Sequence, residues 1–388
     1  MAFGLTATSL APLITFIEAD LNISHTAMGS ILGAWQLTFI VFAIPSGFLL
    51  DRISPRTALT LGTLIIALSS LARAFSTDYL SMICAVMIFG IGGPIISAGA
   101  PKLITRWFSG PSRGLAMGIY MTGPAIGAIV SLTLTHSVLL PSLGSWQNLM
   151  LAIAGFCSVT ALFWFVIASG LQLQTTQIET TGPIKPKQTT VFLALIKLPA
   201  VRLLLLMSLG IFTINHALNN WLPELLKLTG MSLIEAGYWA AIPTAIGILG
   251  SLTIPRLATP RRRFKILFCL CLCSALASYL LLFQSSPLLT TGLLLQGIVR
   301  YSIMTILILI LVEIPGIDDK YAGIASGLFF TAAEIGGVFG PLGLGLLYDL
   351  TGDFQLGLMV LTFIAGLIAM ATFWLDRLLK MKPPHFAP

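Results

Sequence analysis

The chain contains a series of apolar stretches, each long enough to cross a lipid bilayer as a helix. A helix needs about 20 apolar residues to span the hydrocarbon core, and unpaired backbone groups are not tolerated in lipid, so such stretches are helices. Only 9% of the 388 residues are charged, against about 25% in soluble domains. We expect an all-α polytopic membrane protein with twelve spans, near residues 2–19, 27–50, 57–77, 79–104, 114–139, 147–170, 199–222, 232–255, 264–284, 287–313, 321–347 and 355–376.

The basic side chains gather at one set of span ends. All 21 Lys and Arg residues fall there except Arg73, Lys227 and Arg300. Cytoplasmic loops carry the Lys and Arg excess of membrane proteins. We therefore expect a multi-pass protein of the inner (plasma) membrane with both termini in the cytoplasm, and no nucleic-acid partner despite the net charge of +7. The first span starts almost at Met1, which suggests a truncated first helix.

Side chains that could carry catalysis or hold a metal are sparse. The five cysteines fall inside expected spans, without the second Cys or His pair that a zinc site needs. The four histidines are scattered, and the sequence has no nucleotide-binding G-x-x-x-x-G-K-[ST] loop. We expect no enzyme activity, no metal and no cofactor. An enzyme or a sensor on a transporter fold is the alternative from another class.

A polar segment divides the chain into two similar halves. Residues 171–198 are rich in Gln, Thr, Pro and Lys, as a flexible cytoplasmic linker would be. Two stretches of the first half align with the second half, namely 114–118 with 323–327 and 144–147 with 352–355. Such paired repeats are typical of transporters. We expect an N-terminal six-helix bundle at 1–170, the linker at 171–198, a C-terminal six-helix bundle at 199–376 and a cytoplasmic tail at 377–388.

The loop between the second and third spans resembles the signature loop of the Major Facilitator Superfamily. Residues 47–56 read GFLLDRISPR, against a family pattern of G-x-L-x-D-R-x-G-R-[KR]; Ser54 and Pro55 depart from it. Residues 89–94, FGIGGP, and the later Pro101-Lys102 are similar to the cyanate permease and nitroimidazole transporter group. The resemblance implies a monomer that works by alternating access, with the first, fourth, seventh and tenth spans lining a central cavity.

The same resemblance implies a cytoplasmic gate. In it the Asp51 carboxylate interacts with a helix end and with nearby Arg side chains. The gating candidates are Asp51, Arg52, Arg106 and Arg113. The alternative for the arginines is that they only mark the cytoplasmic side.

Two ionisable residues fall near mid-membrane, where charges are costly and usually functional. Arg300 lies in the tenth span and Glu334 in the eleventh, and Gln296 lies one turn before Arg300. A guanidinium offers a planar fork of donors for oxyanions, so we expect Arg300 to bind an anionic substrate. A buried ion pair with Glu334 is the alternative. Glu334 is the candidate for coupling, because a carboxyl group withdrawn from water can carry a proton, but it could equally be structural.

The seventh span adds further polar candidates. Asn215, His216 and Asn219 lie close to one another on that helix, and Tyr301 follows Arg300. These groups either line a cavity or hydrogen-bond a neighbouring helix. The sequence thus predicts a secondary transporter (a symporter or uniporter) for a small, anionic solute, with protons as the candidate coupling ion. Efflux of hydrophobic compounds, as in multidrug transporters, is the alternative.

Overall fold

The computed structural model describes residues 1–170, 188–283, 286–314, 317 and 319–381, and these residues form helices and no strand. It contains twelve helical segments long and apolar enough to cross a membrane, which confirms the predicted fold class and span count. The helices are α1 (Ala2–Thr8), α2 (Ile14–Leu21), α3 (His25–Arg52), α4 (Pro55–Ala74), α5 (Tyr79–Trp107), α6 (Gly110–Leu134), α7 (Leu140–Leu143), α8 (Trp146–Gly170), α9 (Gln188–Lys197), α10 (Pro199–Leu228), α11 (Leu233–Leu257), α12 (Arg263–Leu280), α13 (Ser286–Arg300), α14 (Ser302–Val312), α15 (Asp319–Thr351) and α16 (Gln355–Met381).

Three of the spans are composite. A 3-10 turn at Ala11–Leu13 separates α1 from α2 in the first span, and a π-helical turn at Thr135–Leu139 separates α6 from α7 in the fifth. In the tenth span α13 and α14 are separated at Tyr301. Interruptions in membrane helices free backbone groups that need other partners, so they often mark functional sites.

Polar residues between spans start the helices where the sequence places them. Ser24 accepts a hydrogen bond from the backbone of Ala27, which begins α3, and Ser54 accepts one from Thr57, which begins α4. Asp78 and Ser81 form a capping box at the start of α5. The Asp78 carboxylate accepts a hydrogen bond from the Ser81 backbone N–H, and this bond lowers the pKa of the carboxyl group. Such caps satisfy N–H groups that a helix start leaves unpaired.

The two halves repeat one backbone feature at the aligned loop. Gly144 and Gly352 both have positive φ angles, of 78° and 80° respectively. Each ends a helix in the left-handed region, where glycine has no steric penalty. The sequence alignment of 144–147 with 352–355 therefore corresponds to the same turn in both halves.

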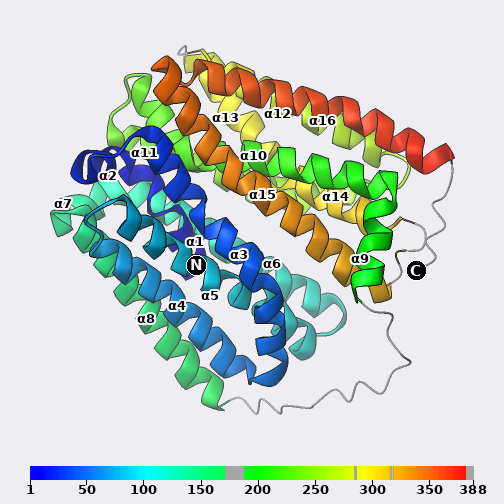
Figure 1. The fold of residues 1–388 in the computed structure, drawn as a ribbon, viewed down its shortest axis with the longest axis horizontal. Coiled ribbons are helices and arrows are strands. Elements are labelled where there is room, and N and C mark those ends of the chain that lie inside the picture. Colours follow the sequence, from blue (N-terminus) through cyan, green and yellow to red (C-terminus); the bar gives the residue numbers. More distant parts are fainter. Residues whose placement is uncertain (171–187, 284–285, 315–316, 318, 382–388) are drawn as a thin grey trace. The chain divides into compact units, whose positions relative to one another are not determined.

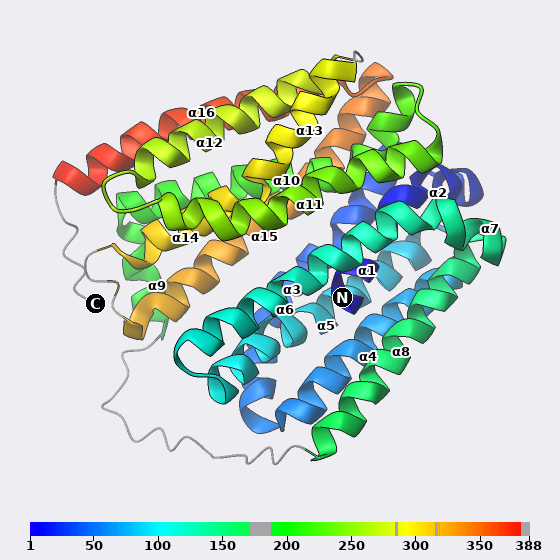
Figure 2. The same ribbon diagram turned by 180° about the vertical axis from the view of Figure 1, so that it is seen from behind.

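The residues group into two compact units. Unit 1 comprises Met1–Thr176, Leu218–Ala241 and Pro341–Gly352; unit 2 comprises Gln177–Ala217, Ile242–Gly340 and Asp353–Pro388. In unit 1, α4 packs along α5 and α8, and α3 packs along α5. Figures 1 and 2 show α4 and α8 side by side in both views. The predicted bundle boundaries at 170 and 199 remain a prediction.

In unit 2, α12 pairs with α16 along its length, as both ribbon views show. The end of the predicted linker is helical, because α9 covers Gln188–Lys197. Its Val191 and Leu195 lie one turn apart and are both buried, so burial of one apolar face stabilises this short helix. The remainder of the predicted linker, 171–187, and the end of the predicted tail, 382–388, lie outside the described residues.

Candidate functional site

The interruption of the tenth span places Arg300 at a helix end inside unit 2. α13 ends at Arg300, and Tyr301 has φ −109° and ψ −18° before α14 begins at Ser302. The Ser302 hydroxyl donates to the Ile298 carbonyl oxygen at 2.8 Å. Arg300 is 7% exposed although it is charged. A buried guanidinium needs several acceptors or an anion, so this break is the strongest candidate site in unit 2.

Close packing against α11 holds the interrupted helix in place. A Cβ atom on Gly297 would lie 2.7 Å from Cβ of Ile246, and one on Gly247 would lie 2.8 Å from the Tyr301 ring. Glycine therefore lets α11 and α13 approach to backbone distance at this level. Tyr301 is half-buried, and its ring centroid lies 5.5 Å from the Arg300 guanidinium carbon.

The predicted polar face of α10 reaches the same break. The Asn215 side-chain amide donates to the Arg300 carbonyl oxygen at 3.0 Å. His216 and Arg300 are close enough for their charges to interact. The structure thus brings Arg300, Tyr301, Asn215 and His216 together. Asn219 is half-buried on α10 and belongs to unit 1.

Gln296 is buried one turn before Arg300 on α13. Its side chain is 1% exposed, and among the residues that the structure describes neither its amide nitrogen nor its amide oxygen has a hydrogen-bond partner. Most buried polar atoms in native proteins are paired. A buried amide with two unsatisfied atoms is therefore a candidate for binding a polar ligand or water.

Glu334 lies on another helix and is separate from this group. It is 7% exposed on α15, and its Oε2 atom has no partner within the described part of the chain. A neighbouring stretch of α15 packs tightly on α10: a Cβ atom added to Gly336 would lie only 2.0 Å from the Leu209 carbonyl oxygen. No ion pair joins Glu334 to Arg300 among the described residues. The buried Arg300–Glu334 ion pair, which the sequence left open as an alternative, is therefore absent from the described part of the chain.

The predicted gating residues have different partners from those expected. Lys102 is the partner of Asp51: its ammonium nitrogen lies 2.5 Å from the carboxylate and 3.0 Å from the Leu50 carbonyl oxygen. Arg113 donates to the Phe108 and Thr105 carbonyl oxygens at the end of α5 instead. These carbonyl groups are left unpaired by the helix end, and a cation satisfies them well.

Arg52 and Arg106 are the two remaining predicted gating arginines. Arg52 is exposed at the end of α3. The side chain of Arg106 lies outside the described residues.

Arg73 is a further buried cation that was not among the predicted site residues. It is 1% exposed on α4. Its guanidinium donates to the Thr6 carbonyl oxygen at 3.0 Å and to the Ser9 hydroxyl at 3.2 Å, next to the interruption between α1 and α2. The position of the break could not be read from the sequence. Within the described residues, no group of three His, Cys, Asp or Glu residues could hold a metal ion.

Comparison with known proteins assigns the fold to a family. The model of the Major Facilitator Superfamily matches residues 1–341. The chain is 27% identical to a quinolone resistance transporter of Acinetobacter baumannii, over 89% of this chain and 84% of the relative. It is 22% identical to the hexuronate transporter of Bacillus subtilis (strain 168), over 97% and 92%.

A solved structure has the same fold. It is a bacterial homolog of the human lysosomal transporter Spinster in an inward-facing, unoccupied conformation. The two structures superpose with a TM-score of 0.78 at 15% identity, covering 98% of this chain and 95% of the other.

Proposed function

Because this chain belongs to the Major Facilitator Superfamily and is a secondary transporter of that type, not an enzyme, we propose that it moves a small anionic solute by alternating access. The observation that carries the proposal is the buried Arg300 guanidinium at the interruption between α13 and α14. A planar fork of donors at a helix break suits a carboxylate. The hexuronate relative supports an anion, because a hexuronate carries a carboxylate.

We assign the neighbouring residues complementary roles. Gln296 offers two unsatisfied amide atoms to a polar solute, and Asn215, through its bond to the Arg300 carbonyl, holds the break in position. His216, Asn219 and Tyr301 remain proposed lining residues. Glu334 remains the proposed proton carrier, because a buried carboxyl group without a partner on one oxygen can bind and release a proton.

The cytoplasmic gate also remains a proposal. The Asp51–Lys102 ion pair supports a latch at that end of unit 1. Both partners are largely exposed, and exposed ion pairs contribute little, about 0–1 kcal/mol. Such a weak contact suits a gate that opens in each cycle. Arg113 would serve it by capping α5.

Location and subgroup follow the sequence. The proposed setting is the inner membrane, with both termini in the cytoplasm and a monomer as the working unit. We propose membership of the cyanate permease and nitroimidazole transporter group on the similarity of residues 89–94 to that group. The relatives named above carry other substrates.

Efflux of hydrophobic compounds is the second candidate. The quinolone resistance relative favours it. A quinolone also carries a carboxylate, so Arg300 could act in either direction of transport. The two candidates differ in solute size and in the direction of flux, and one screen can separate them.

The test is a thermal-shift screen of the purified chain against hexuronates, other small anions and quinolones. A bound solute raises the melting temperature by stabilising the folded protein. The hit is then measured with Arg300→Ala, Arg300→Lys and, as a control, Arg256→Ala, which removes an exposed arginine. Truncating one partner of a buried charge pair costs about 2–5 kcal/mol, so Arg300→Ala is expected to weaken binding at least roughly 30-fold.

Uptake of the hit into proteoliposomes then gives the direction of transport. Unchanged binding in both Arg300 variants would remove this residue from the site. Binding of quinolones but of no small anion would favour the efflux reading.

A further inference from the structure

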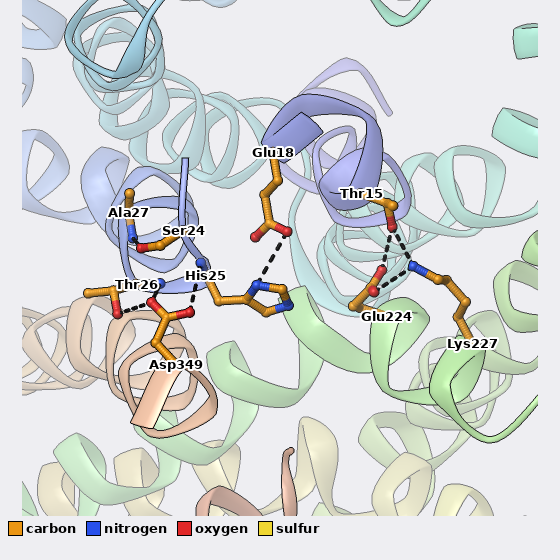
Figure 3. A network of polar contacts seen from close by, with 9 residues as sticks. All are labelled: Thr15, Glu18, Ser24, His25, Thr26, Ala27, Glu224, Lys227 and Asp349. Atoms are coloured by element: carbon orange, nitrogen blue, oxygen red, sulfur yellow. Dashed lines mark hydrogen bonds and ion pairs between the residues drawn. The ribbon is translucent and has the colours of Figure 1, made fainter. Parts of the chain in front are cut away.

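Unit 1 contains a second polar cluster, at the opposite end of α3 from Asp51 and absent from the predicted sites. It joins α2 and the start of α3 to the last turns of α10 and to the end of α15 (Figure 3). We call it the outer-end cluster, and its residues are Thr15, Glu18, His25, Thr26, Glu224, Lys227 and Asp349. By the distribution of basic residues, this end faces away from the cytoplasm.

One part of the outer-end cluster is fully paired. Lys227 donates to Glu224 at 2.7 Å and to the Thr15 hydroxyl at 2.8 Å, and that hydroxyl donates to the other Glu224 oxygen at 2.8 Å. Each charge has an opposite charge or a hydrogen bond. This triad joins α2 to α10 without needing a proton from solution.

Asp349 is satisfied by the start of α3. Its carboxylate accepts from the backbone N–H groups of His25 and Thr26 at 3.2 and 2.8 Å, and from the Thr26 hydroxyl at 2.5 Å. A carboxylate at a helix N-terminus is stabilised by the unpaired N–H groups and by the helix dipole. Asp349 therefore stays ionised and joins α15 to α3.

Glu18 is the acid that these contacts leave incompletely paired. Its Oε2 atom lies 3.3 Å from Nδ1 of His25, and its Oε1 atom is buried with no partner among the described residues. A neutral imidazole with its hydrogen on Nδ1 already donates to a carboxylate, and an added proton on the pair removes one negative charge and gives a charge-assisted contact. An added proton therefore strengthens the Glu18–His25 contact.

The charged groups around His25 favour an added proton on the Glu18–His25 pair. They are Glu18 on α2, Glu224 and Lys227 on α10 and Asp349 on α15. Three carboxylates against one ammonium leave an excess of negative charge around the ring, which attracts a cation.

The His25 ring also lies between two aromatic rings. It stacks on Tyr348 with ring centroids 3.9 Å apart and on Trp221 at 5.2 Å. These stacked rings hold the imidazole in place beside Glu18.

We propose that the Glu18–His25 pair is a proton-binding site that holds the outer-end cluster closed. One added proton, taken from water on this side, strengthens the contact between α2 and α3 beside the α10 and α15 ends. When this proton leaves, three carboxylates remain against one ammonium, and their repulsion loosens the cluster. More protons are bound in the closed arrangement than in the open one, so the closed arrangement is favoured at low pH and is lost as the pH rises.

The inference uses the alternating access of the proposed function but not the proposed anion. It is tested without any solute, so its outcome is independent of the Arg300 proposal. Spin labels are attached to cysteines at Ala19 on α2 and Ile234 on α11, both exposed, in the full chain without its native cysteines. Pulsed electron resonance then gives the distance distribution between pH 5 and pH 9.

We expect the population with the shorter distance between the two labels, which is the closed arrangement, to dominate at low pH and to decrease as the pH is raised. A one-proton equilibrium changes the ratio of the two populations by at most about tenfold per pH unit. Glu18→Gln and His25→Gln each remove the titrating pair and are expected to abolish the pH dependence. Asp20→Asn is the matched control, because Asp20 lies near Glu18 on α2 but accepts from Trp146 and Gln147 instead; it should keep the wild-type profile.

The two pair variants are tested independently, so that loss of folding in one leaves the other. A wild-type distribution that is constant from pH 5 to pH 9, or a profile that survives in either folded variant, would overturn the proposal. Loss of the profile in Asp20→Asn would also overturn it, since the response would then not be specific to the pair.

Discussion

At the residue scale, two buried arginines lie beside interrupted spans. Arg73 donates to the Thr6 carbonyl near the break between α1 and α2, and Arg300 ends α13 at the break before α14. The last carbonyl groups of a helix lack backbone partners and carry partial negative charge. Arg73 shares the Thr6 carbonyl with the backbone N–H and hydroxyl of Ser9. At Arg300, Asn215 pairs the backbone carbonyl.

Glu334 allows coupling to be separated from binding. Glu334→Gln keeps the shape of the side chain but cannot release a proton. We expect proteoliposomes with this variant to lose solute accumulation driven by a proton gradient. They should retain solute exchange at equal proton concentration, because exchange needs only binding and reorientation.

The measurement is uptake of the thermal-shift hit with and without an imposed pH gradient. Asp376→Asn is the control, because Asp376 pairs with Lys380 near the end of α16. Full proton-driven accumulation by Glu334→Gln would show that Glu334 is structural.

At the element scale, unit 1 depends on close contact between α3 and the end of α15. A Cβ atom on Gly29 would lie 2.4 Å from the Pro341 carbonyl oxygen, and one on Gly345 would lie 2.3 Å from the His25 carbonyl oxygen. The indole N–H of Trp221 donates to the same Pro341 carbonyl at 2.9 Å. Small residues let membrane helices approach closely and gain van der Waals contact. This contact also positions His25 in the outer-end cluster.

Gly345→Ala tests that contact. The added methyl group would overlap the α3 backbone, and overpacking of this kind costs about 1–3 kcal/mol. We expect a lower melting temperature for the purified chain. Gly343→Ala is the matched control on α15, because nothing lies within 4 Å of a Cβ atom there. It should leave the melting temperature unchanged or raise it, since alanine favours a helix over glycine by about 1 kcal/mol. Equal effects of both variants would contradict the close contact.

At the scale of the whole molecule, orientation in the membrane can be tested directly. The basic residues predict that the end of α16 lies in the cytoplasm and that the loop at Gly230 lies on the other side. Alkaline phosphatase is active only outside the cytoplasm. A fusion after Met381 should therefore be inactive and one after Gly230 active. The reverse pattern would invert the proposed sidedness of the outer-end cluster.

The sequence by itself determined the number of spans, the family and the buried cation of the tenth span. The length of the apolar stretches and the placement of Lys and Arg were sufficient to count the spans, because a chain like this crosses lipid only as helices. A charge such as Arg300 is conspicuous in an apolar span whatever surrounds it.

Only the tertiary structure decided which polar residues meet. Asp51 pairs with Lys102, and Glu18 pairs with His25 while Asp349 caps the helix that His25 begins. His25 and Asp349 are 324 positions apart in the chain. Helical periodicity places neighbours only three or four residues apart on one face. Contacts between distant helices depend instead on packing, which here is set by glycines that let one backbone approach another.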